Sequence, residues 1–337
     1  MGTSLCPVRR GRTVARVIVV LAGGVGGARF LRGLLAVVGT GTEVVVVGNT
    51  GDDITLFGLR VCPDLDTVMY TLGGGISESQ GWGRIDDTYT VMTELTAYGA
   101  GPTWFGLGDK DFATHILRSQ LLAAGSTLSE ATAVLCRRWA PGVRLLPMTD
   151  TPVETHVEID DGSGSRLVHF QQWWVGMHAE VPARGVRVLG IDGARPAPGV
   201  LEAIAAADVV LLPPSNPVVS VGTILGVPGI RDAVARTAAP VVGLSPIVGG
   251  APVRGMADKV LAAIGVETDA GAVARHYGAR PTGVLDGWLV DSEDKDLVEG
   301  VETAGIACRA VPLLMRDLAT TAEMARAALA LAQEVRR

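Results

Sequence analysis

Residues 17–22, Val-Ile-Val-Val-Leu-Ala, form an unbroken apolar run, and the glycine-rich string of residues 23–27 follows it directly. A strand that is apolar at every position is buried on both faces, which is typical of a parallel sheet covered by helices. A second apolar run, Glu43–Val47, follows a segment with helical character at Ala28–Val38. The order strand, glycine turn, helix, strand predicts a βαβ unit with a right-handed crossover.

The parallel pattern returns in the second half of the chain. We expect further strands there at Val186–Ile191, Asp208–Leu212, Pro240–Leu244, Thr282–Val290 and Ile306–Val311, and helices at Gly199–Ala206, Pro228–Arg236 and Thr321–Val335. Between the halves we expect helices at Leu65–Leu72, Thr88–Tyr98, Lys110–Ala124 and Ser129–Trp139, with Ser129 as the cap of the last one. Glu154–Ile159 and Arg166–Trp174 alternate around the turn residues 160–165, which predicts a β-hairpin.

These elements predict an α/β fold with a doubly wound, mostly parallel Rossmann-like sheet. We expect residues 1–337 to form a single domain, with a helical insertion at about 65–150 that covers the active-site crevice. Hydrophobic residues make up 48% of the chain and charged residues 19%, so a large core can be buried.

Composition excludes several classes of protein. The formal net charge of −6 argues against nucleic acid as a partner, because binding to a phosphate backbone needs a basic face. Free thiols in a reducing compartment are predicted from the wide spacing of Cys6, Cys62, Cys136 and Cys308. The apolar runs Val14–Ala22 and Val209–Pro214 are far shorter than the roughly 20 residues of a membrane span. The arginines of the first 16 residues precede no cleavage site, so we expect a cytoplasmic protein with no membrane segment.

Four predicted strands end in segments rich in Gly, Asn, Ser or Pro, at residues 23–27, 49–53, 213–217 and 245–250. Ligands of doubly wound sheets bind at these carboxyl ends. The backbone N–H groups of the glycine turn can approach phosphate oxygens, and the helix N-terminus behind them favours negative charge. The alternative is a tight turn without a ligand. Arg29 stands where a dinucleotide fingerprint has its third glycine, and no P-loop lysine follows, so we expect a phosphorylated nucleotide of another kind.

Four aspartates, Asp52, Asp53, Asp64 and Asp66, lie on predicted loops beside this turn. Mg²⁺ prefers one or two carboxylates together with phosphate oxygens, and these residues can supply them. Local structure explains them equally well, because Asp64 could cap the helix at Leu65–Leu72 and Asp53 could form a turn. Both interpretations stay open at this point.

The remaining polar candidates are weaker. Ser215-Asn216 and Ser245-Pro246 offer groups suited to a base, a ribose or a phosphate, although each pair alone is an ordinary turn. His115 lies one helical turn before Arg118, and a single histidine on a helix is more often structural. We expect structural roles for His156 and His169, and a place in the core or at a dimer surface for Trp173-Trp174.

Short sequence strings spread over most of the chain resemble those of one protein family, and they occur in the same order as in that family. They are Leu-Ala-Gly23-Gly-Val-Gly-Gly-Ala-Arg29, Gly51-Asp52-Asp53, Cys62-Pro-Asp-Leu-Asp-Thr-Val-Met-Tyr70, Leu107-Gly-Asp-Lys-Asp-Phe-Ala-Thr-His115, Leu146-Pro-Met, His169-Phe-Gln, Pro214-Ser-Asn-Pro217, Ser245-Pro-Ile and Pro252-Val-Arg-Gly-Met-Ala-Asp258. Together they resemble the 2-phospho-L-lactate transferase family, which makes the side chain of the deazaflavin coenzyme F-420. The strings Arg60-Val-Cys-Pro, Thr71-Leu-Gly-Gly-Gly and Gly81-Trp-Gly resemble its actinobacterial branch, the phosphoenolpyruvate transferases.

The resemblance implies a transferase of a substituted phosphate group. A three-carbon acid is activated as its phosphate joined to GMP. The terminal ribityl hydroxyl of the deazaflavin Fo (7,8-didemethyl-8-hydroxy-5-deazariboflavin) attacks the phosphorus that carries the acid, and GMP leaves. The actinobacterial donor would be enolpyruvyl-diphospho-guanosine, which gives dehydro-coenzyme F-420-0, whereas archaeal relatives use a phospholactyl donor. The resemblance further implies Mg²⁺ dependence and a homodimer.

The resemblance also implies roles for particular residues. Asp52 and Asp64 match the metal-binding aspartates, and Asp66 matches a position implicated in Fo binding. Thr50 and Met92 are further candidates for the Fo pocket. The nucleotide would contact Gly23, Gly24, Gly26, Gly27, Ser215, Asn216, Ser245 and Pro246. Gly106 departs from the family, since archaeal members can carry lysine there, and Lys110 could replace its contact with Fo.

Phosphoryl transfer depends on in-line placement and charge neutralisation more than on covalent help. No nucleophile system of Ser–His or Cys–His type is evident, so we expect direct displacement, with Asp52, Asp64 and Asp66 as the catalytic carboxylates. Asp66 or Asp53 could orient or deprotonate the hydroxyl. Two other functions compete with this one. A regulator of the gluconeogenesis-factor type would share the fold and bind nucleotide sugars, and a nucleotidyltransferase would share the glycine-rich loop but needs a lysine close behind it.

Overall fold

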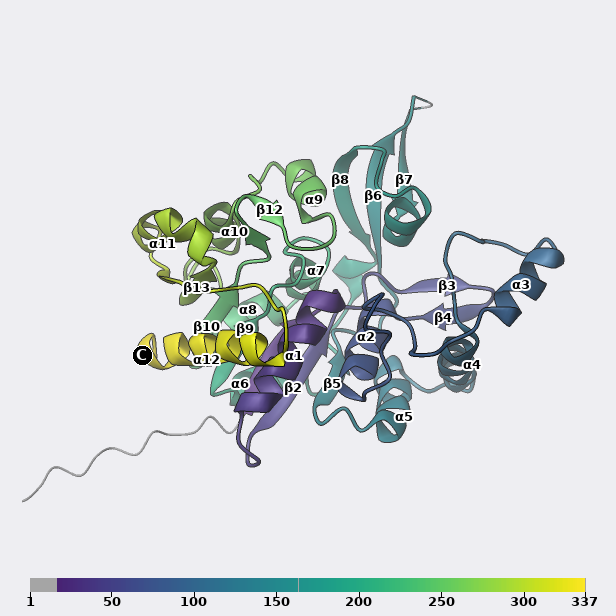
Figure 1. Ribbon diagram of the computed structural model, residues 1–337, viewed down its shortest axis with the longest axis horizontal. Helices are drawn as coiled ribbons and strands as arrows, with labels where there is room; N and C mark the ends of the chain where they lie inside the picture. The colour runs from purple at the N-terminus through teal and green to yellow at the C-terminus, as the bar shows by residue number, and fades with distance from the viewer. Residues whose placement is uncertain (1–16, 163, 337) are drawn as a thin grey trace, which may run out of the picture.

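The computed structural model describes residues 17–162 and 164–336. A seven-stranded sheet at its centre has the order β14-β13-β10-β9-β1-β2-β5, and all its pairings are parallel (Figure 1). The strands are β1 (Val17–Ala22), β2 (Glu43–Gly48), β5 (Arg144–Pro147), β9 (Val209–Leu212), β10 (Val241–Leu244), β13 (Gly287–Val290) and β14 (Ala307–Ala310). The strand order reverses between β1 and β9, as it does at the ligand crevice of doubly wound folds. The predicted fold class is confirmed.

Helices cover both faces of the sheet, because the side chains of each strand alternate between two cores. In β1, Val19 and Leu21 enter one core, whereas Ile18 and Val20 enter the other. The second core is covered by α1 (Gly24–Val37), α2 (Pro63–Leu72), α5 (Leu128–Trp139) and α12 (Leu318–Glu334). The first is covered by α6 (Val200–Ala206), α7 (Val221–Gly226), α8 (Ile230–Arg236), α9 (Ala257–Ala263), α10 (Ala270–Tyr277) and α11 (Val298–Thr303).

The segment between β2 and β5 is mostly helical, as predicted, but begins with a small hairpin. The hairpin pairs β3 (Ile54–Leu56) with β4 (Leu59–Val61), and it packs with α3 (Thr90–Ala97) and α4 (Asp109–Ala123) on the right of Figure 1. The chain returns to the central sheet as β5, within the range expected to be helical.

The expected cap of α5 is wrong. Thr127 is the N-cap, and it forms a capping box with Glu130. Ser129 instead uses its backbone N–H and its hydroxyl to bond the Asp150 carboxylate.

A separate three-stranded antiparallel sheet contains the predicted hairpin. It joins β6 (Glu154–Asp160) to β7 (Ser165–His169) and β8 (Ala183–Leu189), at the top of Figure 1. Two expectations are wrong here. The second hairpin strand ends at His169, and a short π-helix (Gln172–Gly176) follows with Trp173 fully buried in it. The strand expected at Val186–Ile191 is β8, which pairs antiparallel with β6 instead of joining the parallel sheet.

Cys62, Cys136 and Cys308 are free thiols, as predicted. Cys6, the arginine-rich residues 1–16 and Ser163 of the hairpin turn lie outside the described residues. Across residues 17–162 and 164–336, none of the helices is long and apolar enough to cross a membrane.

Candidate active site

A cavity of about 640 Å³ opens at the carboxyl ends of β1, β2, β9 and β10, where the strand order reverses. The ends of these strands contribute Gly23, Asp52, Ser215 and Ser245 to its wall. Further parts of the wall come from α2, α4 and the loop of residues 80–89. The segments predicted to converge on one crevice therefore do so.

The glycine turn is the first turn of α1, because the helix begins at Gly24 and not at Ala28 as expected. Gly23, Gly24 and Gly26 line the cavity, whereas Gly27 is buried behind them. A Cβ atom on Gly23 would lie 2.5 Å from Asp64 Oδ2, and one on Gly26 would lie 2.3 Å from the Pro214 carbonyl oxygen. Close packing thus requires glycine here, and it keeps the helix N-terminus open towards the cavity.

The two predicted serines line the cavity, but their hydroxyls are already engaged. Ser215 Oγ accepts from the Gly23 N–H (3.2 Å) and donates to the Gly23 carbonyl oxygen (2.8 Å). Ser245 Oγ makes the same two bonds to the backbone of Ile247. Asn216 Oδ1 accepts from the N–H groups of Val218 and Val219. These side chains hold the strand ends of β9 and β10 in place around the glycine turn.

Asp52 and Asp64 lie together in the wall of the cavity. Asp52 follows β2, and Asp64 lies in the first turn of α2. Asn49 links the two segments that carry the pair. Its Nδ2 donates to Asp64 Oδ2 (2.9 Å), and its Oδ1 accepts from the Gly51 N–H (2.9 Å). The capping interpretation of Asp64 is wrong, because Cys62 is the N-cap of α2 and makes no side-chain capping bond.

Burial and the neighbouring Asp64 carboxylate raise the pKa of Asp52 well above its usual range. Burial also raises the pKa of Asp64 to about 6, although hydrogen bonds from Asn49 and the Gly24 backbone oppose the shift. The buried Oδ1 of Asp52 has no hydrogen-bond partner among the described residues. Two crowded carboxylates with an unsatisfied oxygen suit a bound divalent cation, which would stabilise their charged forms.

The Asp52–Asp64 pair can supply only some of the ligands that Mg²⁺ needs. No group of three or more potential ligands of the His, Cys, Asp and Glu types occurs within the described part of the chain. Mg²⁺ is commonly held by one or two carboxylates, with substrate phosphates and water completing its octahedron. Asp53 is not among the residues that line the cavity, and its Oδ2 accepts from Arg60 (3.2 Å) and from Cys62 Sγ (3.0 Å).

Asp66 faces the same cavity but belongs to a buried charge network. Arg118 on α4 donates to both of its carboxylate oxygens, with Nη1 lying 3.1 Å from Oδ2. His115 Nε2 lies 3.3 Å from Asp111 Oδ2, and Tyr70 donates its hydroxyl proton to Asp111 Oδ1 (2.7 Å). The network joins α2 to α4, and His115 lines the cavity from within it. Its sequence signal was the spacing of Asp111, His115 and Arg118 on one helical face.

Several predicted ligand contacts lie outside the cavity wall as the described residues define it. Thr50 is buried, and Met92 packs in a small core with Leu107 and Phe112. The ammonium group of Lys110 donates to the carbonyl oxygens of Ile85 and Asp86, in the loop of residues 80–89. Contacts of these residues with a ligand stay predictions.

Sequence reasoning missed part of the cavity wall. The wall includes three further arginines and six aromatic residues, namely Arg29, Arg84, Arg254, Tyr70, Trp82, Tyr89, Phe105, Phe170 and Trp174. His169 is structural as expected: its Nδ1 accepts from the Gln171 N–H, and its Nε2 lies 3.2 Å from the Asp53 carbonyl oxygen. Burial lowers the pKa of His169, which favours this neutral form.

Comparisons with known proteins identify the family of this chain. The model of the family 2-phospho-L-lactate transferase CofD matches residues 18–310. A protein of Kitasatospora aureofaciens named phosphoenolpyruvate transferase is 68% identical over 95% of this chain and 98% of its own length. Proteins of the same name from Thermobifida fusca and Mycobacterium sp. (strain JLS) are 64% and 54% identical, over 95% and 94% of this chain and 98% of each relative.

A solved structure of a UPF0052 family protein from Bacillus halodurans shares the fold, with a TM-score of 0.60 over 93% of this chain and 98% of that one. Its 19% sequence identity supports the fold alone. The family model and the curated relatives each cover most of this chain. The chain therefore belongs to the 2-phospho-L-lactate transferase family, and it is a transferase.

Proposed function

We propose that this transferase acts in coenzyme F-420 biosynthesis, by moving a phosphoenolpyruvyl group from a GMP-activated diphosphate donor to the terminal ribityl hydroxyl of Fo. The observation that carries the proposal is the Asp52–Asp64 pair, which faces the open N-terminus of α1 inside one cavity. The names of the relatives favour the phosphoenolpyruvyl group over the phospholactyl group. The product would be dehydro-coenzyme F-420-0.

We assign the first turn of α1 and the Asp52–Asp64 pair to the donor, and Asp66 to the acceptor. The first turn of α1 presents backbone N–H groups to the GMP phosphate, and these stabilise negative charge as GMP leaves. Asp52 and Asp64 would hold Mg²⁺, which supplies charge neutralisation and orientation to a diphosphate. Asn49 keeps the Asp64 carboxylate directed at this position.

Asp66 would orient the acceptor hydroxyl. Each carboxylate oxygen has two lone-pair sites, so Asp66 can accept a further hydrogen bond while Arg118 holds both oxygens. The ribityl oxygen forms a new bond to the phosphorus that carries the acid. The bond from that phosphorus to the bridging oxygen breaks, GMP departs with this oxygen, and the hydroxyl proton passes to water.

The test is mass spectrometry of the product formed from Fo with each candidate donor, enolpyruvyl, lactyl or glyceryl, with and without Mg²⁺. We expect Mg²⁺-dependent formation of dehydro-coenzyme F-420-0 and equimolar GMP. A protein that binds a UDP-sugar but neither binds Fo nor forms a product would contradict the proposal. Light scattering in solution tests the accompanying expectation of a homodimer.

A further inference from the structure

Three guanidinium groups that line the 640 Å³ cavity of the candidate active site have no carboxylate partner among the described residues. They belong to Arg29, Arg84 and Arg254. Arginines nearby are paired: Arg118 with Asp66, and Arg32 with Glu78 at 2.7 Å. Guanidinium groups that face a cavity without an acidic partner favour an anionic ligand.

Arg84 lies over two aromatic rings, whereas Arg254 lies over one, that of Trp82. The Arg84 guanidinium lies over the rings of Trp139 (4.3 Å) and Tyr70 (5.2 Å), on the side of the helical segment. These aromatic contacts fix its position. The candidate anion site therefore rests on Arg29 and Arg254.

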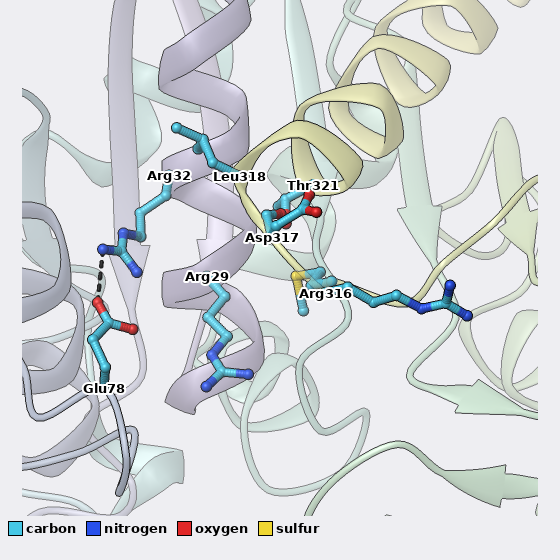
Figure 2. A pocket seen from close by; sticks show the side chains of 8 residues that line it. Arg29, Arg32, Glu78, Arg316, Asp317, Leu318 and Thr321 are labelled. Carbon is cyan, nitrogen blue, oxygen red and sulfur yellow. Dashed lines mark hydrogen bonds and ion pairs between the residues drawn. The ribbon is translucent and has the colours of Figure 1, made fainter.

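Arg29 lies on α1 close behind the glycine turn. Figure 2 shows its side chain running along the helix axis, away from the Arg32–Glu78 pair. Side chains on a helix lean towards its N-terminus, so the guanidinium of Arg29 extends towards the end of α1 that opens into the cavity. Arg29 also lines a second, smaller cavity of about 300 Å³, the side cavity, between α1 and the start of α12.

Arg254 reaches the same place from the loop before α9. Its Nη2 donates to the Gln80 carbonyl oxygen, and its guanidinium lies 5.3 Å from the ring centre of Trp82. A Cβ atom on Gly81 would lie 2.8 Å from Arg254 Nη1 and 3.1 Å from Val25 in the glycine turn. Arg254 is thus held beside the first turn of α1. Both guanidinium groups line the same cavity, and burial together with the positive charge of Arg29 lowers the pKa of Arg254.

A charge count shows what the two arginines can neutralise. Mg²⁺ would cancel the two charges of Asp52 and Asp64. The proposed donor carries three further negative charges, two on its diphosphate and one on the carboxylate of its acid. The N-terminus of α1 offers only about half a positive charge. Two guanidinium groups bring the sum close to zero.

We propose that Arg29 and Arg254 form an oxyanion subsite beside the first turn of α1, next to the position of the GMP phosphate, which takes the acid-bearing half of the donor and is distinct from the Asp52–Asp64 pair. This inference rests on the proposed function. The shared chemistry is an oxyanion, which can be the phosphate or the carboxylate of that half. A guanidinium binds either one through two parallel hydrogen bonds.

The test replaces each arginine with methionine, which keeps much of the apolar stem. The variants are Arg29→Met, Arg254→Met and the double variant. Arg316→Met is the matched control, because Arg316 lines the side cavity but points away from Arg29 (Figure 2). Calorimetry on the full-length, Mg²⁺-loaded protein measures binding of GMP, of GDP, and of phosphoenolpyruvate to protein saturated with GMP. Thermal unfolding confirms that each variant folds.

We expect GMP to bind all variants equally, within about twofold. GDP or phosphoenolpyruvate should bind each single variant about tenfold more weakly, and the double variant about 100-fold more weakly, which corresponds to about 1.4 kcal/mol per arginine. A loss with GDP identifies the phosphate as the bound group, and a loss with phosphoenolpyruvate alone identifies the carboxylate.

Two outcomes would overturn the subsite. One is unchanged binding of both GDP and phosphoenolpyruvate to the double variant, and the other is an equal loss of GMP. Failure of the proposed function is a separate result, since it would appear as wild-type protein that binds these probes but makes no product from Fo.

Discussion

The two halves of the cavity are built by different physical means. The half at the ends of β1, β9 and β10 consists of backbone and small side chains, with serine hydroxyls bonded to Gly23 and Ile247. The half contributed by α2 and α4 consists of buried charges, with Asp66 and Arg118 paired across 52 residues of sequence. The first half depends on close packing and the second on charge compensation. Their tolerance to substitution should differ accordingly.

The strongest test of this difference is Arg118→Met. Arg118 is 1% exposed and paired with Asp66, so its loss would leave a buried carboxylate without its partner. Breaking a buried ion pair in this way costs about 3–5 kcal/mol of unfolding free energy. Denaturant titration measures this loss. Arg326→Met is the control, because the exposed Arg326–Glu323 pair should contribute at most about 1 kcal/mol.

The double variant Asp66→Asn/Arg118→Met separates stability from function. It removes both charges, so we expect it to recover most of the lost stability, whereas the KM for Fo should rise because Asp66 no longer orients the acceptor hydroxyl as a carboxylate. Recovery of both properties would show that the network is structural only.

The next largest effect is expected from Asp52→Asn, which lies at the border of the two halves. Loss of one of two carboxylates that hold Mg²⁺ should lower turnover about 10²–10³-fold, equivalent to about 3–4 kcal/mol. Stability should change by less than about 1 kcal/mol, because the metal-free carboxylate is already disfavoured by burial and by Asp64. Steady-state kinetics across a range of Mg²⁺ concentrations measures the first effect. Wild-type turnover at saturating Mg²⁺ would refute the metal assignment.

The glycine half is tested by Gly26→Ala. The new methyl group would lie 2.3 Å from the Pro214 carbonyl oxygen, which is backbone and cannot turn aside. Overpacking of this kind costs about 1–3 kcal/mol and should move α1 away from β9. We expect weaker GMP binding together with a lower melting temperature. Gly39→Ala is the control, since a Cβ atom there meets nothing within 4 Å.

The sequence was informative where structure follows from local pattern. The buried run before the glycine turn fixed β1, and the strand ends converge because parallel strands share one edge. Local pattern failed for β8, where a short alternating strand suits either sheet and only its pairing with β6 decides. It could not choose between Asp53 and Asp64 either. That choice depends on Arg60 and Cys62, which bond Asp53 outside the cavity.

The contacts of the charged half could also not be predicted from the sequence, because they join residues that are far apart in the chain. The spacing of Asp111, His115 and Arg118 predicts a shared helical face, but not that Asp66 of α2 lies against it. Arg29 and Arg254 are 225 positions apart in the chain, and neither belongs to a pattern that predicts contact. Long-range pairing of side chains has no local signal.

The smallest effect is expected from Ser215→Ala, which tests whether the serines of the glycine half act on the ligand or on the backbone. Ser215 Oγ satisfies both the N–H and the carbonyl oxygen of Gly23, so alanine would leave two buried polar groups with one partner fewer. The cost should be about 1 kcal/mol of unfolding free energy, because water from the cavity can replace part of the bonding. If the hydroxyl serves the backbone, Ser215→Ala and Ser245→Ala should each lower stability while GMP affinity changes less than about threefold, or roughly 0.7 kcal/mol. Unchanged stability with a tenfold loss of GMP affinity would instead assign the hydroxyl to the nucleotide.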